Sequence, residues 1–314
     1  MSTVPLVLDD GEHADALLKA KSEAMRTAQR IITTATEERA ARLLPETDAD
    51  HARLLALRQP GASTWMVHTN TNHLYRLSDS DVQHQLRLNL GMPPTNNDER
   101  CMCGAPLTHG HAQTCLRLRK KCTETRHDTV VRAFARCATD AALTVHVEAR
   151  PLHRHNEPIP HRLRPDLLIE GPDVNVLADV VITTPTAPTY LNAGSARAPL
   201  RAAHINAQRK VQKYAELAKH ERRDLYPVAI ESYGGMAEKA RALINLIADR
   251  AAEAGGAGQY QRTETLSHVR AVVAAALVRG NARLVETVIR HAQRPRSRAI
   301  VRAANGGIMV ALRA

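Results

Sequence analysis

Three cysteines and two histidines lie within one short segment, CMCGAPLTHGHAQTC, which runs from Cys101 to Cys115. Zinc sites in proteins use four cysteine or histidine ligands, often grouped as two close pairs on a short stretch of chain. Cys101 and Cys103 form one pair, and His111 and Cys115 form the other. Gly104 permits a tight turn after the first pair. The spacing predicts a zinc-binding unit with these four ligands.

Other residues compete for this role. His109 lies two positions before His111 and is an alternative fourth ligand, and Cys122 lies just beyond the segment. The C-x-C spacing of the first pair is tighter than the commoner C-x2-C. The alternative interpretation is a reduced cysteine pair in a polar loop with solvated histidines. Cys137 falls on the inward face of an expected helix and is interpreted as a small core residue.

A second set of residues suits a harder metal ion. Asp166 and Asp179 fall on two consecutive expected strands, within RPDLLIEGPDVNVLADVVI. A short hairpin would place these strands side by side, so that both carboxylates meet at one end of the sheet. Two converging carboxylates suit Mg2+, which binds few protein oxygens and retains its waters. The alternative is a pair of solvent-facing aspartates on ordinary strands.

Phosphate chemistry at such a site also requires a positive group. Lys210 and Lys213 lie on the next expected helix, whose predicted buried stripe consists of Val211, Tyr214, Ala215 and Ala218. Lys210 borders that stripe and is the favoured catalytic lysine, whereas Lys213 is expected to point further toward solvent. The alternative is that both lysines belong to a solvated helix face.

The composition favours a polyanionic partner. The formal net charge is +11, from 43 Lys+Arg against 32 Asp+Glu, which fits nucleic acid first and an anionic membrane surface second. Aromatic residues make up only 3 % of the chain, which favours contact with a duplex backbone over base stacking on single strands. Four basic residues follow the cysteine segment and are predicted to contact DNA phosphates, with an exposed helix face as the alternative: Arg117, Arg119, Lys120 and Lys121.

Cysteine usage and hydropathy indicate the compartment. The cysteines are not spaced as a disulfide framework, and no apolar run approaches the roughly 20 residues of a membrane span. The first residues, MSTVPLVLDDGEHADALL, lack the features of a secretory signal. We therefore expect a reducing, intracellular location without membrane contact, and a nuclear one for a DNA-binding protein.

Hydrophobic periodicity predicts an α/β core in which a mixed sheet is flanked by helices. Ser78 and Gly91 are predicted to cap the two ends of one helix. Strands are predicted over 143–150, 163–170, 176–183 and 226–232. Further helices are predicted over 10–44, 47–57, 125–143, 205–220, 236–253, 262–279 and 281–292, the last two separated at Gly280-Asn281.

Four regions follow from these patterns. Residues 1–60 form a helical N-terminal region or linker, and residues 61–122 form a helical segment with the zinc unit. Residues 123–254 form the α/β core, and residues 255–314 form C-terminal helices with a basic tail.

In their order along the chain, these segments resemble the C-terminal region of non-LTR retrotransposon proteins of the lineage with a restriction-like endonuclease. In that family a zinc knuckle follows the reverse transcriptase and leads into a Pro-Asp…Asp/Glu-x-Lys nuclease. The resemblance covers about residues 60–290. The segments that carry it are STWM, LSDSDVQHQLRLNLGMPP, CMCG…HGHAQTC, RHD (126–128), RPDLLIE, LADVVI, RKVQKY and PVAIESYGG.

The resemblance implies a restriction-endonuclease-like sheet and a metal-dependent endonuclease that nicks target DNA. It implies structural zinc on the four ligands of the cysteine segment, Mg2+ on Asp166 and Asp179, and catalysis by Lys210 with Lys213 behind it. Arg126 and His127 are expected to contact phosphate, with capping or solvation as the alternative. Glu231 is expected near the same site as an acidic or structural group, or else as a surface residue at a strand end.

Two departures from the family pattern leave other functions open. The motif's Asp/Glu-x-Lys reads Asp179-Val180-Val181, without the lysine, and the sequence contains no Asp-Asp polymerase motif. The alternative function is a catalytically inactive, zinc-containing nucleic-acid-binding remnant. A third is an interaction protein that binds partners through its helical ends. Element RNA is a further expected partner, with a reverse transcriptase supplied by another chain.

Overall fold

The computed structural model describes residues 23, 47–67, 72–95, 99–115, 119–148, 163–255 and 259–304, with only the backbone at 109, 119–124, 259–260 and 293–304. The chain divides into two compact units, Met1–Glu46 and Thr47–Ala314. The predicted helix over 10–44 lies outside the described residues except at position 23. The finer region boundaries at 60, 122 and 254 stay predictions.

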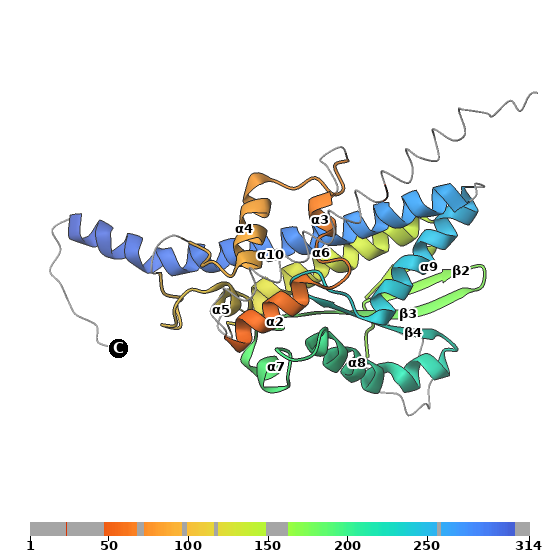
Figure 1. The fold of residues 1–314 in the computed structure, drawn as a ribbon, viewed down its shortest axis with the longest axis horizontal. Helices are drawn as coiled ribbons and strands as arrows, with labels where there is room; N and C mark the ends of the chain where they lie inside the picture. Colours follow the sequence, from red (N-terminus) through yellow and green to blue (C-terminus); the bar gives the residue numbers. More distant parts are fainter. Residues whose placement is uncertain are drawn as a thin grey trace, which may run out of the picture. The chain divides into compact units, whose positions relative to one another are not determined.

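The described elements of the second unit alternate between helix-rich and strand-rich stretches (Figure 1). In chain order they are α2 (Asp48–Leu57), α3 (Thr64–Val67), α4 (Asp79–Leu90), α5 (His109–Thr114), α6 (Arg119–Asp140), β1 (Thr144–Val147), β2 (Leu167–Gly171), β3 (Val174–Thr183), α7 (Pro188–Asn192), α8 (Arg201–His220), β4 (Asp224–Glu231), α9 (Glu238–Ala254) and α10 (Gln259–Ala304).

The four strands form one mixed sheet in the order β1-β2-β3-β4. The pairs β1–β2 and β2–β3 are antiparallel, and β4 pairs with β3 in parallel after a connection through α7 and α8. A parallel pair requires a crossover of this kind, usually a helix. The sequence prediction of a mixed α/β core is confirmed.

Helices cover both faces of the sheet, with α8 on one side and α6, α9 and α10 on the other (Figure 1). Residues that alternate along β2 and β3 separate accordingly, because successive side chains of a strand point to opposite faces. Leu167 and Ile169 pack into the cluster that contains Phe134 of α6. Leu168 and Leu177 pack instead against α8. Both faces of the sheet are covered, which explains why five consecutive residues of β3, 176–180, are buried.

The helix predicted from LSDSDVQHQLRLNLG is confirmed as α4. The Ser78 side chain accepts the backbone N–H of Asp81, whose carboxylate accepts the N–H of Ser78, so the two residues form a capping box. Gly91 ends the helix at φ 70°, a left-handed conformation that favours glycine.

The predicted break at Gly280-Asn281 is wrong, because α10 continues through it. A Cβ on Gly280 would lie 2.7 Å from Cγ and 3.1 Å from Cα of Arg126. Gly280 therefore serves the close approach of α10 to α6 and does not end a helix. The helix predicted over 125–143 also begins earlier, at Arg119, and β2 begins at Leu167 and not at 163.

The buried stripe of α8 is only partly as predicted. Tyr214 and Ala218 are buried, but Val211 is 41 % exposed and Ala215 is exposed. Leu217 completes the buried face in their place. The stripe is displaced around the helix because Tyr214 and Leu217, three residues apart, set its phase.

Within the described residues, no helix combines the length and apolar character that crossing a membrane would require.

Candidate functional site

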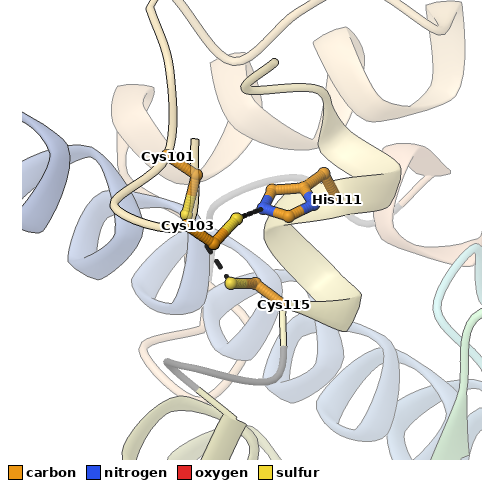
Figure 2. Close-up of side chains that lie close together, drawn as sticks. All are labelled: Cys101, Cys103, His111 and Cys115. Carbon is orange, nitrogen blue, oxygen red and sulfur yellow. Dashed lines mark hydrogen bonds between the residues drawn. The ribbon is translucent and has the colours of Figure 1, made fainter. Parts of the chain in front are cut away.

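The ligand atoms of Cys101, Cys103, His111 and Cys115, here called the Cys3His cluster, all lie within 4.8 Å of one another. Figure 2 marks two contacts within the cluster: Sγ of Cys103 is 3.2 Å from Nε2 of His111, and Sγ of Cys101 is 3.6 Å from Sγ of Cys115. In a zinc tetrahedron with Zn–S of about 2.3 Å, two sulfurs lie about 3.8 Å apart. The donor set and its spacing fit zinc, so the cluster could hold such a metal.

Local backbone interactions bring these ligands together. The N–H of Cys101 donates to the carbonyl of Ala105 at 2.9 Å, and the N–H of Gly104 donates to the carbonyl of Cys101 at 2.8 Å. Gly104 has φ 88°, so the tight turn predicted there is confirmed. The Thr108 side chain caps α5 by accepting the N–H of His111, and Cys115 follows directly after that helix. The side chains of His109 and Cys122 lie outside the described part.

The cluster rests on the long C-terminal helix. Cys101 and Cys115 are buried against Leu284, Val285 and Val288 of α10. Burial raises the pKa of the Cys101 thiol to about 11, whereas a backbone hydrogen bond from Ala105 lowers the pKa of Cys103. A bound cation would favour both thiolates, because metal ligands must be deprotonated.

The two predicted acidic residues face each other across β2 and β3. The register pairs Leu167 with Ala178, and one further step places Asp166 opposite Asp179. Oδ2 of Asp166 accepts the N–H of Val180 at 2.7 Å. Asp179 is 1 % exposed, and burial, followed by the negative charge of Asp166, raises the pKa of its carboxyl group. Together with His127 and Lys210, these two aspartates form what is here called the carboxylate site.

His127 reaches the carboxylate site from α6. Its Nε2 lies 2.9 Å from Oδ2 of Asp166 and 3.2 Å from the carbonyl of Val180. Burial alone would lower the pKa of His127, but the hydrogen bond and charge of Asp166 outweigh it and raise the pKa to about 9. This raised pKa favours the protonated form of His127 at neutral pH.

The two lysines of α8 have different environments. Nζ of Lys210 forms an ion pair with Asp179. Lys213 is exposed, and its Nζ donates to the hydroxyl of Tyr214 at 2.8 Å. That hydroxyl donates in turn to the carbonyl of Arg164 at 2.7 Å, two residues before Asp166. The sequence pattern predicts only that Tyr214 belongs to the apolar stripe. Its position directly after Lys213 is the one feature of the sequence that could have indicated the hydrogen bonds of its hydroxyl group.

Glu231 lies away from the carboxylate site, contrary to the expectation from the sequence. The β3–β4 register pairs Glu231 with Thr183, four residues beyond Asp179, which is about 13 Å along a strand. Glu231 is 1 % exposed, and its carboxylate accepts the backbone N–H groups of Ala202 and Ala203. Burial raises its pKa to about 7. It caps the start of α8, which has no side-chain cap of its own.

Of the basic residues predicted to contact phosphate, Arg126 is enclosed within the fold, and the side chains of Arg117, Arg119, Lys120 and Lys121 lie outside the described part. Arg126 is 4 % exposed, and its Nη1 donates to Gln113 Oε1 at 3.3 Å and to Asn281 Oδ1 at 3.2 Å. This enclosed position does not favour contact with a phosphate. Arg117 lies outside the described residues, and Arg119, Lys120 and Lys121 lie in the first turn of α6 with side chains outside the described part.

Comparison with known proteins gives one informative match. No protein-family model matches the chain. An alignment over 199 residues, which covers 58 % of the chain, shows 27 % identity to the retrotransposable element SLACS 132 kDa protein of Trypanosoma brucei gambiense. The matched stretch spans 15 % of that protein. The similarity supports an origin in a retrotransposable element.

Proposed function

We propose that this chain is a metal-dependent DNA endonuclease of the restriction-like type, derived from a retrotransposable element. The observation that carries the proposal is the gathering of Asp166 and Asp179 with the amine of Lys210, from two strands and the helix packed on them. Phosphodiester hydrolysis requires this combination of oxygen ligands for a divalent cation and a cation for the phosphate.

The carboxylate site fits Mg2+ in its donor chemistry. Asp166 and Asp179 offer two carboxylates from adjacent strands, and hard divalent cations prefer oxygen ligands. Mg2+, when bound, would neutralise phosphate charge and make water a better nucleophile. Lys210 would then be free to bind a non-bridging phosphate oxygen, with Lys213 contributing charge from the adjacent turn. His127 would hold Asp166 in place and contact the phosphate from α6.

The Cys3His cluster would hold structural zinc beside this nuclease core. The basic residues that follow it, Arg117, Arg119, Lys120 and Lys121, would bind the DNA backbone. Such contacts give salt-dependent affinity with little sequence information. In this arrangement the chain would cleave nuclear DNA and would have element RNA as a further partner. The reverse transcriptase would be supplied by another chain. The regions would then be residues 1–60, 61–122, 123–254 and 255–314, with the nuclease in the third.

Two observations favour a second candidate, a nucleic-acid-binding module without catalysis. Val181 stands where the family motif has its strand lysine. In the structure, both carboxylates are already engaged by positive groups, Asp166 by His127 and Asp179 by Lys210.

A plasmid-nicking assay separates the two functions. With Mg2+, the wild-type chain is expected to convert supercoiled DNA to open circles, and Asp166→Asn to reduce the rate by at least about a hundredfold. Asp224→Asn, an exposed aspartate at the start of β4, is the matched control and keeps full activity. Nicking that survives Asp166→Asn argues against the site. Salt-sensitive DNA binding without any nicking by the wild type favours the second candidate.

A further inference from the structure

Buried polar side chains gather where α4, α5, α6, α10 and the end of β3 meet. This buried polar junction consists of Gln85, Gln113, Arg126, Thr184 and Asn281, none more than 5 % exposed. Oε1 of Gln113 accepts from Nη1 of Arg126 at 3.3 Å and from Oγ1 of Thr184 at 2.9 Å. Nδ2 of Asn281 donates to Oε1 of Gln85 at 3.1 Å and to the carbonyl of Ser232 at 2.8 Å.

Arg126 is the charged centre of the junction. Burial lowers its pKa to about 10, a measure of how unfavourable this environment is for a cation. Buried charges are costly unless hydrogen-bonded, and amide oxygens of Gln113 and Asn281 supply bonds here. Gly280 allows the approach, since a Cβ there would lie 3.1 Å from Cα of Arg126.

The junction lies between the two candidate metal centres. Gln113 is on α5 between the cluster ligands His111 and Cys115. Arg126 is followed directly by His127, which binds Asp166. Consecutive residues of a helix point about 100° apart. Within one turn of α6, Arg126 can therefore contact Gln113 on one side while His127 contacts Asp166 on another. The path from cluster to carboxylate runs through Gln113, Arg126, the α6 backbone and His127.

We propose that Arg126 is a positioning residue that couples the Cys3His cluster to the carboxylate site. With a metal held by the cluster, α5 would be ordered, Gln113 would hold Arg126, and this contact would fix the turn of α6 from which His127 holds Asp166. The helix α5 has only 6 residues, too few to be stable without external contacts. Loss of the metal would therefore release Gln113 and loosen the carboxylate site. The effect of this coupling on catalysis rests on the proposed nuclease function. The coupling itself does not require that function.

Hydrogen exchange measured by NMR tests the coupling directly. The N–H of Val180 donates to Oδ2 of Asp166, so its exchange rate reports whether that carboxylate is held. In the full wild-type chain, removal of zinc by a chelator is expected to speed exchange at Val180 and along residues 126–131 by about tenfold. The amides of Val228 and Ile230, in the buried strand β4, serve as an internal reference and keep their rates.

Two variants remove the link in different ways. Arg126→Met removes the guanidinium, and Gln113→Met removes its acceptor while leaving Arg126 in place, which covers the case that the first variant fails to fold. In either variant, zinc removal is expected to change Val180 exchange less than about threefold. Gln113→Met still binds one zinc ion. Arg132→Met, a 74 % exposed arginine on the same helix, is the matched control and retains the full zinc dependence.

Three outcomes would overturn the proposal. The first is Val180 exchange in the wild type that does not respond to zinc removal. The second is a full zinc response in both junction variants. The third is faster exchange everywhere in Arg126→Met, including at Val228, which would make the role of Arg126 merely structural. Because no cleavage is measured, coupling without nicking would count against the nuclease alone, and nicking without coupling would count against this inference alone.

Discussion

The Cys3His cluster and the carboxylate site are assembled in opposite ways. The four cluster ligands lie between Cys101 and Cys115 and come from one turn and one short helix. The carboxylate site draws His127 from α6, Asp166 and Asp179 from the β2–β3 pair, and Lys210 from α8. A local cluster is determined by spacing along the chain, whereas an assembled site is determined by sheet register and helix packing.

The two sites also differ in how their charges are balanced. The Cys3His cluster consists of three thiol groups and one imidazole, and a metal is the natural partner for deprotonated thiols. In the carboxylate site, His127 and Lys210 already neutralise the two aspartates. We therefore expect the cluster to depend on its metal and the carboxylate site to persist without one.

The largest effect is expected from breaking the local cluster. Cys115→Ser removes a thiolate ligand, and zinc affinity should fall by at least about a thousandfold because the remaining donors no longer complete a tetrahedron. Metal content after dialysis and a competition titration with a chromogenic chelator measure this. Cys137→Ala, which removes a buried core cysteine outside the cluster, is the control and keeps one zinc ion. Full zinc retention by Cys115→Ser would make His109 or Cys122 the ligand in its place.

The assembled site is tested next by comparing its two lysines. Lys210→Ala removes the ion pair with Asp179 and should slow nicking by about a hundredfold. Lys213→Ala should slow it only about threefold, since Lys213 contacts the hydroxyl of Tyr214 and not a carboxylate. Lys219→Ala, in the last turn of the same helix, is the control. Equal losses for Lys210 and Lys213 would contradict the assignment of separate roles.

The sequence could predict what depends on local patterns. The cluster spacing, the turn at Gly104 and both caps of α4 are readable because they involve residues close together in the chain. The hairpin that brings Asp166 to Asp179 is also readable, since only a short turn separates two apolar strands.

What the sequence could not predict depends on partners distant in the chain. Glycine is a residue typical of a helix end, and only the close approach of Arg126 explains why Gly280 lies inside the continuous helix α10. Arginine is usually a surface residue, and only the hydrogen bonds to Gln113 and Asn281 explain why Arg126 is buried. Each partner lies on a different element, so no periodicity within one segment reveals the contact.

A smaller effect is expected from Glu231→Gln, which should change how the free energy of unfolding depends on pH. The pKa of this carboxyl group is about 7 in the fold against an ordinary value of 4.5. Proton binding to Glu231 therefore stabilises the fold below about pH 4.5, and this contribution is lost as the pH rises through about 7. Glu231→Gln stays neutral, so its free energy of unfolding relative to wild type should rise by about 3 kcal/mol from pH 4.5 to 8.

Chemical denaturation at several pH values measures that difference for Glu231→Gln. Glu238→Gln, an exposed glutamate in the first turn of α9, is the control and should show no such trend. A pH-independent difference at Glu231 would mean that its bonds to the N–H groups of Ala202 and Ala203 offset the cost of burial.

The smallest effect is expected from removing one hydroxyl that holds the assembled site together. Tyr214→Phe deletes the group that accepts from Lys213 and donates to the carbonyl of Arg164, fifty residues away in the chain. Loss of these bonds should lower the free energy of unfolding by about 1 kcal/mol, and nicking should slow only about threefold, because Lys210 still holds Asp179. Zinc content should not change. Tyr226→Phe, a partly buried tyrosine of β4, is the control. If Tyr214→Phe reduced zinc binding as well as nicking, the local cluster would depend on the packing of α8, and the two sites would differ less in construction than their sequences indicate.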